Sequence, residues 1–175
     1  DLYIVLGEGS IEKGWVVRAG SARTGNGNTS ATPEVLVAIG GLATALAAAT
    51  ISSTEWDISE FDVSAGGTLS VTVNYNEQIT VAGSPTIAVT NSQAGGGSAA
   101  SLSLTKSAAT ANTVTFTLVV GAGGSTISAD DVLSIAAQNV ALAGGTITDT
   151  VASSAAAVAI SAGAGSGAGT ITAVA

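Results

Sequence analysis

The chain has 175 residues, of which 46% are hydrophobic, 3% aromatic and 9% charged, and 12 acidic against 4 basic residues give a net charge of −8. So little charge argues against a helical protein with charged faces, and so few basic residues argue against nucleic acid as a partner. The chain has no Cys and no His, which excludes disulfide frameworks, thiol nucleophiles and the usual zinc sites, so we expect a non-enzymatic protein.

Charge divides the chain into two regions. Seven acidic residues lie from Glu8 to Asp62, together with three of the four basic residues. We expect an N-terminal attachment region over residues 1–62, which is partly extended or forms a small β docking region, and a second region over residues 63–175. The charged residues of the second region are Glu77, Lys106, Asp130, Asp131 and Asp149.

The first region carries the candidate contacts with a partner. Lys13, Trp15, Arg18 and Arg23 include the residue types most enriched at binding hot spots, and Arg makes forked contacts with carboxylates. We expect these four residues to bind a protein surface. The alternative is that they cover the protein's own core and serve only solubility.

Residues 35–51 form the longest uncharged apolar stretch of the chain. Their number is near the lower limit for crossing a bilayer, but Gly40 and Gly41 interrupt the stretch and no Lys or Arg flanks it closely. A buried strand or a short core helix is the better interpretation, so we expect no membrane span.

Acidic and apolar residues alternate over residues 55–62. Calcium prefers oxygen ligands, so Asp57, Glu60 and Asp62 are candidate calcium ligands, with Asp130, Asp131 or Asp149 as distant contributors. The alternative is a solvated acidic strand or linker that binds nothing. A glycosidase pair built from Asp57 and Glu60 would need a cleft lined by aromatic residues, and the chain has only six in all. We expect no other cofactor.

From residue 63 onward, β-branched and small polar residues alternate with a period of two, which is typical of strands with one buried face. Turn signals rich in Gly, Ser and Asn separate these runs, as in an antiparallel sandwich. The pattern predicts an all-β, immunoglobulin-like β-sandwich without the disulfide. The expected core positions are Leu69, Val71, Val73, Tyr75, Ile87, Val89, Leu102, Leu104, Val114, Phe116, Leu118, Val132, Leu133 and Ile135.

Two segments of this region carry smaller predictions. Lys106 is expected on an edge strand, where its charge discourages aggregation, rather than in a nucleophilic pair with a nearby Ser. Residues 163–169 contain only Gly, Ala and Ser and lack the Lys of a phosphate-binding loop, so we expect a linker or turn. Residues 170–174 are expected to return as a final strand.

Residues 71–91 (VTVNYNEQITVAGSPTIAVTN) and 113–150 (TVTFTLVVGAGGSTISADDVLSIAAQNVALAGGTITDT) carry a family resemblance. A strand with a Tyr-x-Glu element, a V-x-G-x-P turn, a T-x-T-F-T strand and a G-G-T-I-x-D element occur in this order. Together they resemble the bacterial immunoglobulin-like repeat. The similarity covers residues 69–149; after Asp149 the sequence departs from the usual ending of that repeat.

The resemblance implies an interaction or display role. Such repeats occur in bacterial surface proteins and, as single copies, in structural proteins of tailed phages. One copy behind a different N-terminal segment favours the phage arrangement: a capsid decoration or cement protein on the outer surface of the virion, with the major capsid protein or other virion proteins as partners and a homotrimer as a candidate assembly. The alternatives are a cell-surface or secreted adhesive module and a phage tail or fibre component.

Overall fold

The computed structural model describes residues 2–5, 14–17, 34–38, 48–161 and 169–175. These residues form strands, turns and loops and contain no helix, so the expected all-β class is confirmed. The chain divides into two compact units, Asp1–Leu46 and Ala47–Ala175. In the described ranges, no helix has the length and apolar character needed to cross a membrane.

The first unit contains a three-stranded antiparallel sheet in the order β1-β2-β3. Its strands are β1 (Leu2–Val5), β2 (Gly14–Val17) and β3 (Glu34–Ala38). In the register of the sheet, Trp15 of β2 pairs with Ile4 of β1 and with Val37 of β3. Part of the N-terminal region expected from the sequence thus forms a small antiparallel sheet.

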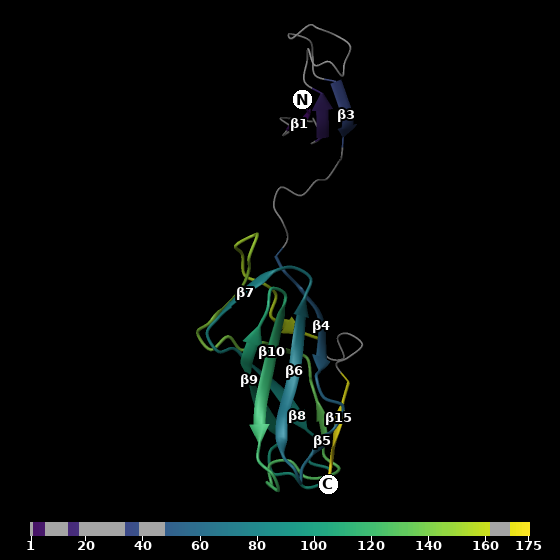
Figure 1. Ribbon diagram of the computed structural model, residues 1–175, viewed down its shortest axis with the longest axis vertical. Coiled ribbons are helices and arrows are strands. Elements are labelled where there is room, and N and C mark those ends of the chain that lie inside the picture. The colour runs from purple at the N-terminus through teal and green to yellow at the C-terminus, as the bar shows by residue number, and fades with distance from the viewer. Residues whose placement is uncertain (1, 6–13, 18–33, 39–47, 162–168) are drawn as a thin grey trace. The chain divides into compact units, whose positions relative to one another are not determined.

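The second unit is built on an eight-stranded sheet in the order β4-β6-β10-β9-β8-β11-β15-β5 (Figure 1). All neighbouring strands in it are antiparallel except β15 and β5, which run parallel. The strands are β4 (Ile51–Trp56), β5 (Phe61–Asp62), β6 (Gly67–Tyr75), β8 (Thr86–Asn91), β9 (Ser101–Ala109), β10 (Thr113–Val120), β11 (Val132–Ser134) and β15 (Ile171–Val174).

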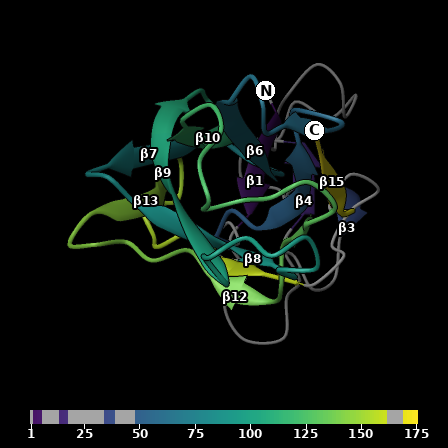
Figure 2. The same ribbon diagram turned by 90° about the horizontal axis from the view of Figure 1, so that it is seen from below.

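This sheet curls because its two edge strands are consecutive in the chain. Eight strands spaced about 4.8 Å apart would separate β4 from β5 by about 34 Å in a flat sheet. The five peptide steps from Trp56 to Phe61 reach at most about 18 Å. The edges must therefore approach each other, and Figure 2 shows the strands of this unit surrounding an interior.

Two small antiparallel sheets complete the second unit. One pairs β7 (Ile79–Ala82) with β13 (Thr146–Asp149), and the other pairs β12 (Gln138–Asn139) with β14 (Ala159–Ile160). The segment around β12 also covers part of β8. The side chain of Gln138 accepts a hydrogen bond from the Ala88 N–H (2.7 Å) and donates one to the Ala88 carbonyl (2.6 Å), so a side-chain amide takes the place of a neighbouring strand.

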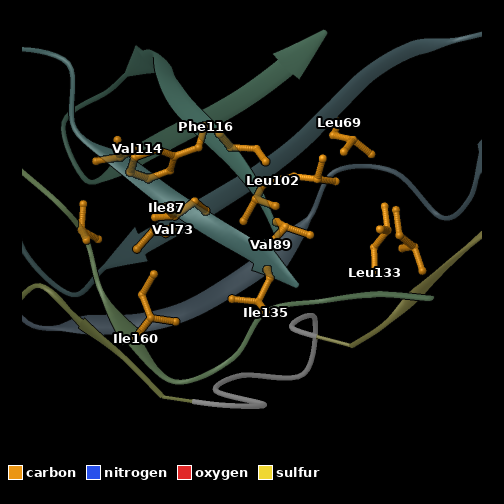
Figure 3. Close-up of a cluster of buried hydrophobic side chains, with 14 of the residues drawn as sticks. Leu69, Val73, Ile87, Val89, Leu102, Val114, Phe116, Leu133, Ile135 and Ile160 are labelled. Carbon is orange, nitrogen blue, oxygen red and sulfur yellow. The ribbon is translucent and has the colours of Figure 1, made fainter. Parts of the chain in front are cut away.

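The core lies inside the curled sheet, and the alternation read from the sequence locates most of it. In β6 the buried residues are Leu69, Val71, Val73 and Tyr75, with polar residues between them. Each large apolar side chain buried in this way stabilises the fold by about 1.5–3 kcal/mol. Figure 3 shows side chains from several strands meeting in this core. The other predicted core residues that are buried are Ile87, Val89, Leu102, Leu104, Val114, Phe116 and Leu133 on neighbouring strands and Ile135 just after β11.

Two predicted core positions are only partly buried. Val132 precedes the buried Leu133 in β11, and successive residues of a strand point to opposite faces of a sheet. Leu118, near the end of β10, is also partly buried and packs against the core.

The division between the units falls before the boundary expected at residue 62. Strands β4 and β5 both belong to the second unit: β4 pairs with β6, and β5 pairs with β15. Charge is a poor marker of this boundary, because Glu55, Asp57 and Asp62 lie exposed on the outside of the second unit.

Candidate functional site

Of the four predicted partner-binding residues, one lies in the part of the chain that the structure describes. Trp15 occupies the central strand of the three-stranded sheet. Lys13, Arg18 and Arg23 lie outside the described residues. Their role in binding a partner stays a prediction.

Two of the predicted calcium ligands are engaged in separate local hydrogen bonds. Asp57 follows β4, and its Oδ2 accepts hydrogen bonds from Ser70 Oγ (2.5 Å) and Thr72 Oγ1 (3.0 Å). Asp62 Oδ1 accepts hydrogen bonds from the Ala65 N–H (2.9 Å) and from Ser64 Oγ (2.7 Å). The hydrogen bond from the Ala65 N–H is the largest cause that lowers the pKa of Asp62 below its ordinary value, and the bond from Ser64 Oγ lowers this pKa further.

Glu60, the third candidate, is exposed between β4 and β5. Among the residues that the structure describes, no group of three or more acidic side chains comes together in a way that could hold a metal ion. The segment 55–62 contains the end of β4, a turn and β5; Asp57 and Asp62 are exposed, and each accepts a hydrogen bond from a neighbouring hydroxyl group.

Asp131, expected as a distant calcium ligand, is instead fully buried. Its Oδ1 accepts a hydrogen bond from the Gly95 N–H (2.8 Å), and its Oδ2 accepts bonds from Asn91 Nδ2 (2.9 Å) and the Ser128 N–H (2.9 Å). Burial raises the pKa of Asp131, but these hydrogen bonds and one from the Gly97 N–H together outweigh it, so the pKa is lowered.

This carboxylate holds the glycine-rich loop 92–98 against the loop before β11. Gly97 is buried, and a Cβ there would overlap with Asp131 Oδ2 and lie 2.9 Å from the Thr126 carbonyl oxygen. Gln93 strengthens the same loop, because its Nε2 donates to the Gly97 carbonyl (2.8 Å). The loop is thus held by Asp131 and by a hydrogen bond between two of its own residues.

Asp149, another expected distant ligand, is also buried, with 1% of its surface exposed. Its Oδ1 accepts hydrogen bonds from the Ala152 N–H (2.7 Å) and the Val151 N–H (2.8 Å), and its Oδ2 accepts one from the Ala49 N–H (3.0 Å). The bond from Ala152 is the first cause that lowers the pKa of Asp149, and burial opposes it. Asp149 therefore ties the start of the second unit to the turn after β13.

Lys106 does not lie on an edge strand as expected. Strand β9 is an interior strand between β10 and β8, and Lys106 sits where the pairing of β9 with β10 shifts register. Its side chain is partly buried, and its backbone N–H donates to the Pro85 carbonyl (2.9 Å).

The outward residues of the main sheet together form a surface that was not predicted from the sequence. Cross-strand register aligns Ser70, Thr117, Thr105 and Thr86 in one row over β6, β10, β9 and β8. A second row contains Thr72 and Thr115, whose hydroxyl groups are hydrogen-bonded (3.0 Å). We call this surface the hydroxyl face.

In the sequence, the residues of the hydroxyl face are visible as Ser and Thr residues that alternate with the core residues. Only the strand order shows that these positions form continuous rows, because strands that are far apart in the chain, such as β6 and β10, are neighbours in the sheet. Chemically the face offers hydroxyl donors and acceptors, with the carboxylates of Glu55 and Asp57 along the β4 edge.

In comparisons with protein-family models, with curated proteins and with solved structures, the chain finds no match.

Proposed function

We propose that the chain is a non-enzymatic structural protein of a virion, a capsid decoration protein that attaches through its N-terminal unit and displays an immunoglobulin-like domain. The observation that carries this proposal is the division of the chain into the small unit Asp1–Leu46 and the larger β unit Ala47–Ala175. The small unit contains three of the four basic residues and Trp15. The larger unit contributes a curled β scaffold whose main sheet carries the hydroxyl face, with the carboxylates of Glu55 and Asp57 along its β4 edge.

The strand order supports the immunoglobulin-like part of the proposal. An immunoglobulin constant domain has strands A, B, E and D in one sheet and C, F and G in the other. With β4, β6, β8, β9, β10, β11 and β15 named A to G in chain order, β4-β6-β10-β9 corresponds to A-B-E-D and β8-β11-β15 corresponds to C-F-G. The hairpin of β8 and β9 then joins the two sheets.

The size of the first unit supports a role in attachment. A segment of 46 residues has little apolar surface to bury, and this one has no cysteine to cross-link it. Binding to a capsid surface would stabilise such a unit by mass action, and many copies on one lattice would add avidity. Bound copies that bridge neighbouring capsid subunits would in turn strengthen the shell.

The test is sedimentation of the full chain with undecorated capsids assembled from the major capsid protein of the same genome. We expect saturable binding in a fixed ratio to the capsid protein. The variant with Lys13, Arg18 and Arg23 all changed to Ala should bind at least tenfold more weakly, while Lys106→Ala, which removes the one basic residue of the second unit, should bind as the parent chain does. Absence of binding by the parent chain would overturn the proposed function, and undiminished binding by the triple variant would overturn the attachment role.

The second candidate is a secreted or cell-surface adhesive module, which one observation favours. Loop 92–98 is held rigidly by the buried Asp131, and binding residues are often carried by loops on a rigid scaffold. In that case a change at the loop, such as Gln93→Ala, would weaken adhesion to host cells, and the triple basic variant would not.

A further inference from the structure

The strand β15 completes the main sheet from the C-terminal end of the chain. It lies between β11 and β5 and pairs with both: Thr172 and Ile171 face Val132 and Leu133 of β11, and Ala173 and Val174 face Phe61 and Asp62 of β5. The predicted final strand is thereby confirmed. It joins two short strands that have no direct pairing with each other in the sheet order.

The position between β11 and β5 is shaped for an extended strand with apolar residues at alternate positions. Ile171 and Ala173 fill it, with 4% and 1% of their surfaces exposed. Backbone groups on both sides hold the strand: the Val63 N–H donates to the Val174 carbonyl (2.9 Å), and the Asp130 N–H donates to the Ala173 carbonyl (2.8 Å). The site therefore holds β15 mainly through main-chain hydrogen bonds and through the two buried side chains of Ile171 and Ala173.

At the start of β15, Trp56 Nε1 donates to the Gly169 carbonyl (2.8 Å). Residues 169–175 carry no charged side chain, and residues 162–168, which precede them, contain only Gly, Ala and Ser. Neither segment carries a charged group that would favour binding to a different protein over binding to a copy of this chain. The segment known to fit the position is the one already seated in it.

We propose that the position between β11 and β5 is a strand-acceptor site that also takes the β15 of a second copy, so that copies are joined by exchange of their C-terminal strands. The contacts made by the strand are the same whether it comes from its own chain or from a second copy, and exchange of an identical element is a low-cost route to association. The balance is set by local concentration. Exchange therefore competes with pairing inside one chain as the concentration of copies rises, and the inference stands without the proposed capsid role.

Cysteine cross-linking tests this directly, because the chain has no native cysteine. Val132 and Thr172 are register partners, and neither is buried. Facing Cβ atoms in antiparallel strands are about 4.5–5.5 Å apart, close to the separation that a disulfide needs. The single variants Val132→Cys and Thr172→Cys, of which one carries a mass tag, are mixed at high concentration and then oxidised.

We expect a mixed disulfide-linked dimer whose yield rises with protein concentration. Thr110→Cys replaces Thr172→Cys in the matched control, since Thr110 is exposed and lies at the distant turn between β9 and β10. The facing pair should give a severalfold higher yield of dimer than this control pair. The double variant with both Val132→Cys and Thr172→Cys shows that the two positions can be linked within one molecule.

The proposal is overturned if the double variant closes its disulfide within each chain while the mixed single variants give no more dimer than the control pair. The readout is independent of any capsid, so its failure leaves the proposed function standing, and failure of capsid binding leaves the exchange standing.

Discussion

At the scale of single residues, the second unit is held by buried carboxylates that use backbone N–H groups as partners. Asp131 and Asp149 accept hydrogen bonds from loops that are distant in sequence, and Asn91 Nδ2 adds a side-chain donor to Asp131. A buried carboxylate with several such donors is stable as an anion. These residues are therefore structural ties between loops.

The lowered pKa values of Asp131 and Asp149 predict that acid weakens the fold. A carboxyl group whose pKa is lower in the folded chain stabilises the fold above its ordinary pKa of 3.8, and that contribution is lost as the pH falls through the lower folded value. We expect the free energy of unfolding, measured by urea titration at a series of pH values, to fall below about pH 5. The variant Asp131→Asn should be less stable at neutral pH and should lose less stability on acidification. An unchanged pH dependence in this variant would contradict the assignment.

The buried hydroxyl group of Thr54 lowers the stability of the fold. It is fully buried in β4, and its Oγ1 has no hydrogen-bond partner. A buried hydroxyl group without a partner costs about 1–3 kcal/mol, and valine has the same shape without it. We expect Thr54→Val to raise the free energy of unfolding by about 1 kcal/mol in denaturant titrations. The comparison variant Thr72→Val, which removes hydroxyl hydrogen bonds to Asp57 and Thr115, should not stabilise the protein.

At the scale of elements, alternation predicts which face of a strand is buried but not what covers the strand's edges. In β6 the predicted and observed buried residues agree at all four positions, since a strand with one face in the core repeats every second residue. Strand β8, which lies between β9 and β11, is different, because the backbone of its Ala88 is hydrogen-bonded to the side chain of Gln138, 50 residues away in the chain. No local pattern marks that glutamine as part of a sheet.

The role of Gln138 gives a prediction for this element. Changing Gln138 to Leu removes two hydrogen bonds to the backbone of Ala88. We expect a loss of about 1–3 kcal/mol in the free energy of unfolding, at about 0.5–1.5 kcal/mol for each bond. Asn139→Ala, an exposed change in the same short strand, is the matched control and should alter stability by less than about 0.5 kcal/mol. Equal stability of the two variants would show that water replaces the glutamine without cost.

At the scale of the whole molecule, the position of the unit boundary decides which part of the chain folds by itself. The second unit begins before β4, and the curled sheet needs β4 and β5 as its two edges. Ala49 and Phe61, which precede the boundary expected from charge, are buried in its core. A domain that starts at residue 63 would lack these contacts.

Two truncated chains test this boundary. We expect residues 47–175 to fold alone and to unfold in a single cooperative transition in denaturant, as a single domain of this size usually does. Residues 63–175 should be unfolded or aggregated in circular dichroism and size-exclusion experiments, because β6 and β15 each lose a paired strand. A cooperative transition in the shorter chain would mean that β4 and β5 are dispensable.

The sequence by itself determined the all-β class, most of the core of the second unit and the final strand, because period-two alternation and turn residues act over a few neighbouring positions. Only the tertiary structure decided the strand order, the hydroxyl face, the burial of Asp131 and Asp149 and the position of the boundary between the two units. These features depend on pairings between residues far apart in the chain, such as Asp149 with Ala49, and no local pattern encodes such pairings. An aspartate that ties two loops and an aspartate that faces solvent look the same in the sequence until the chain around them has folded.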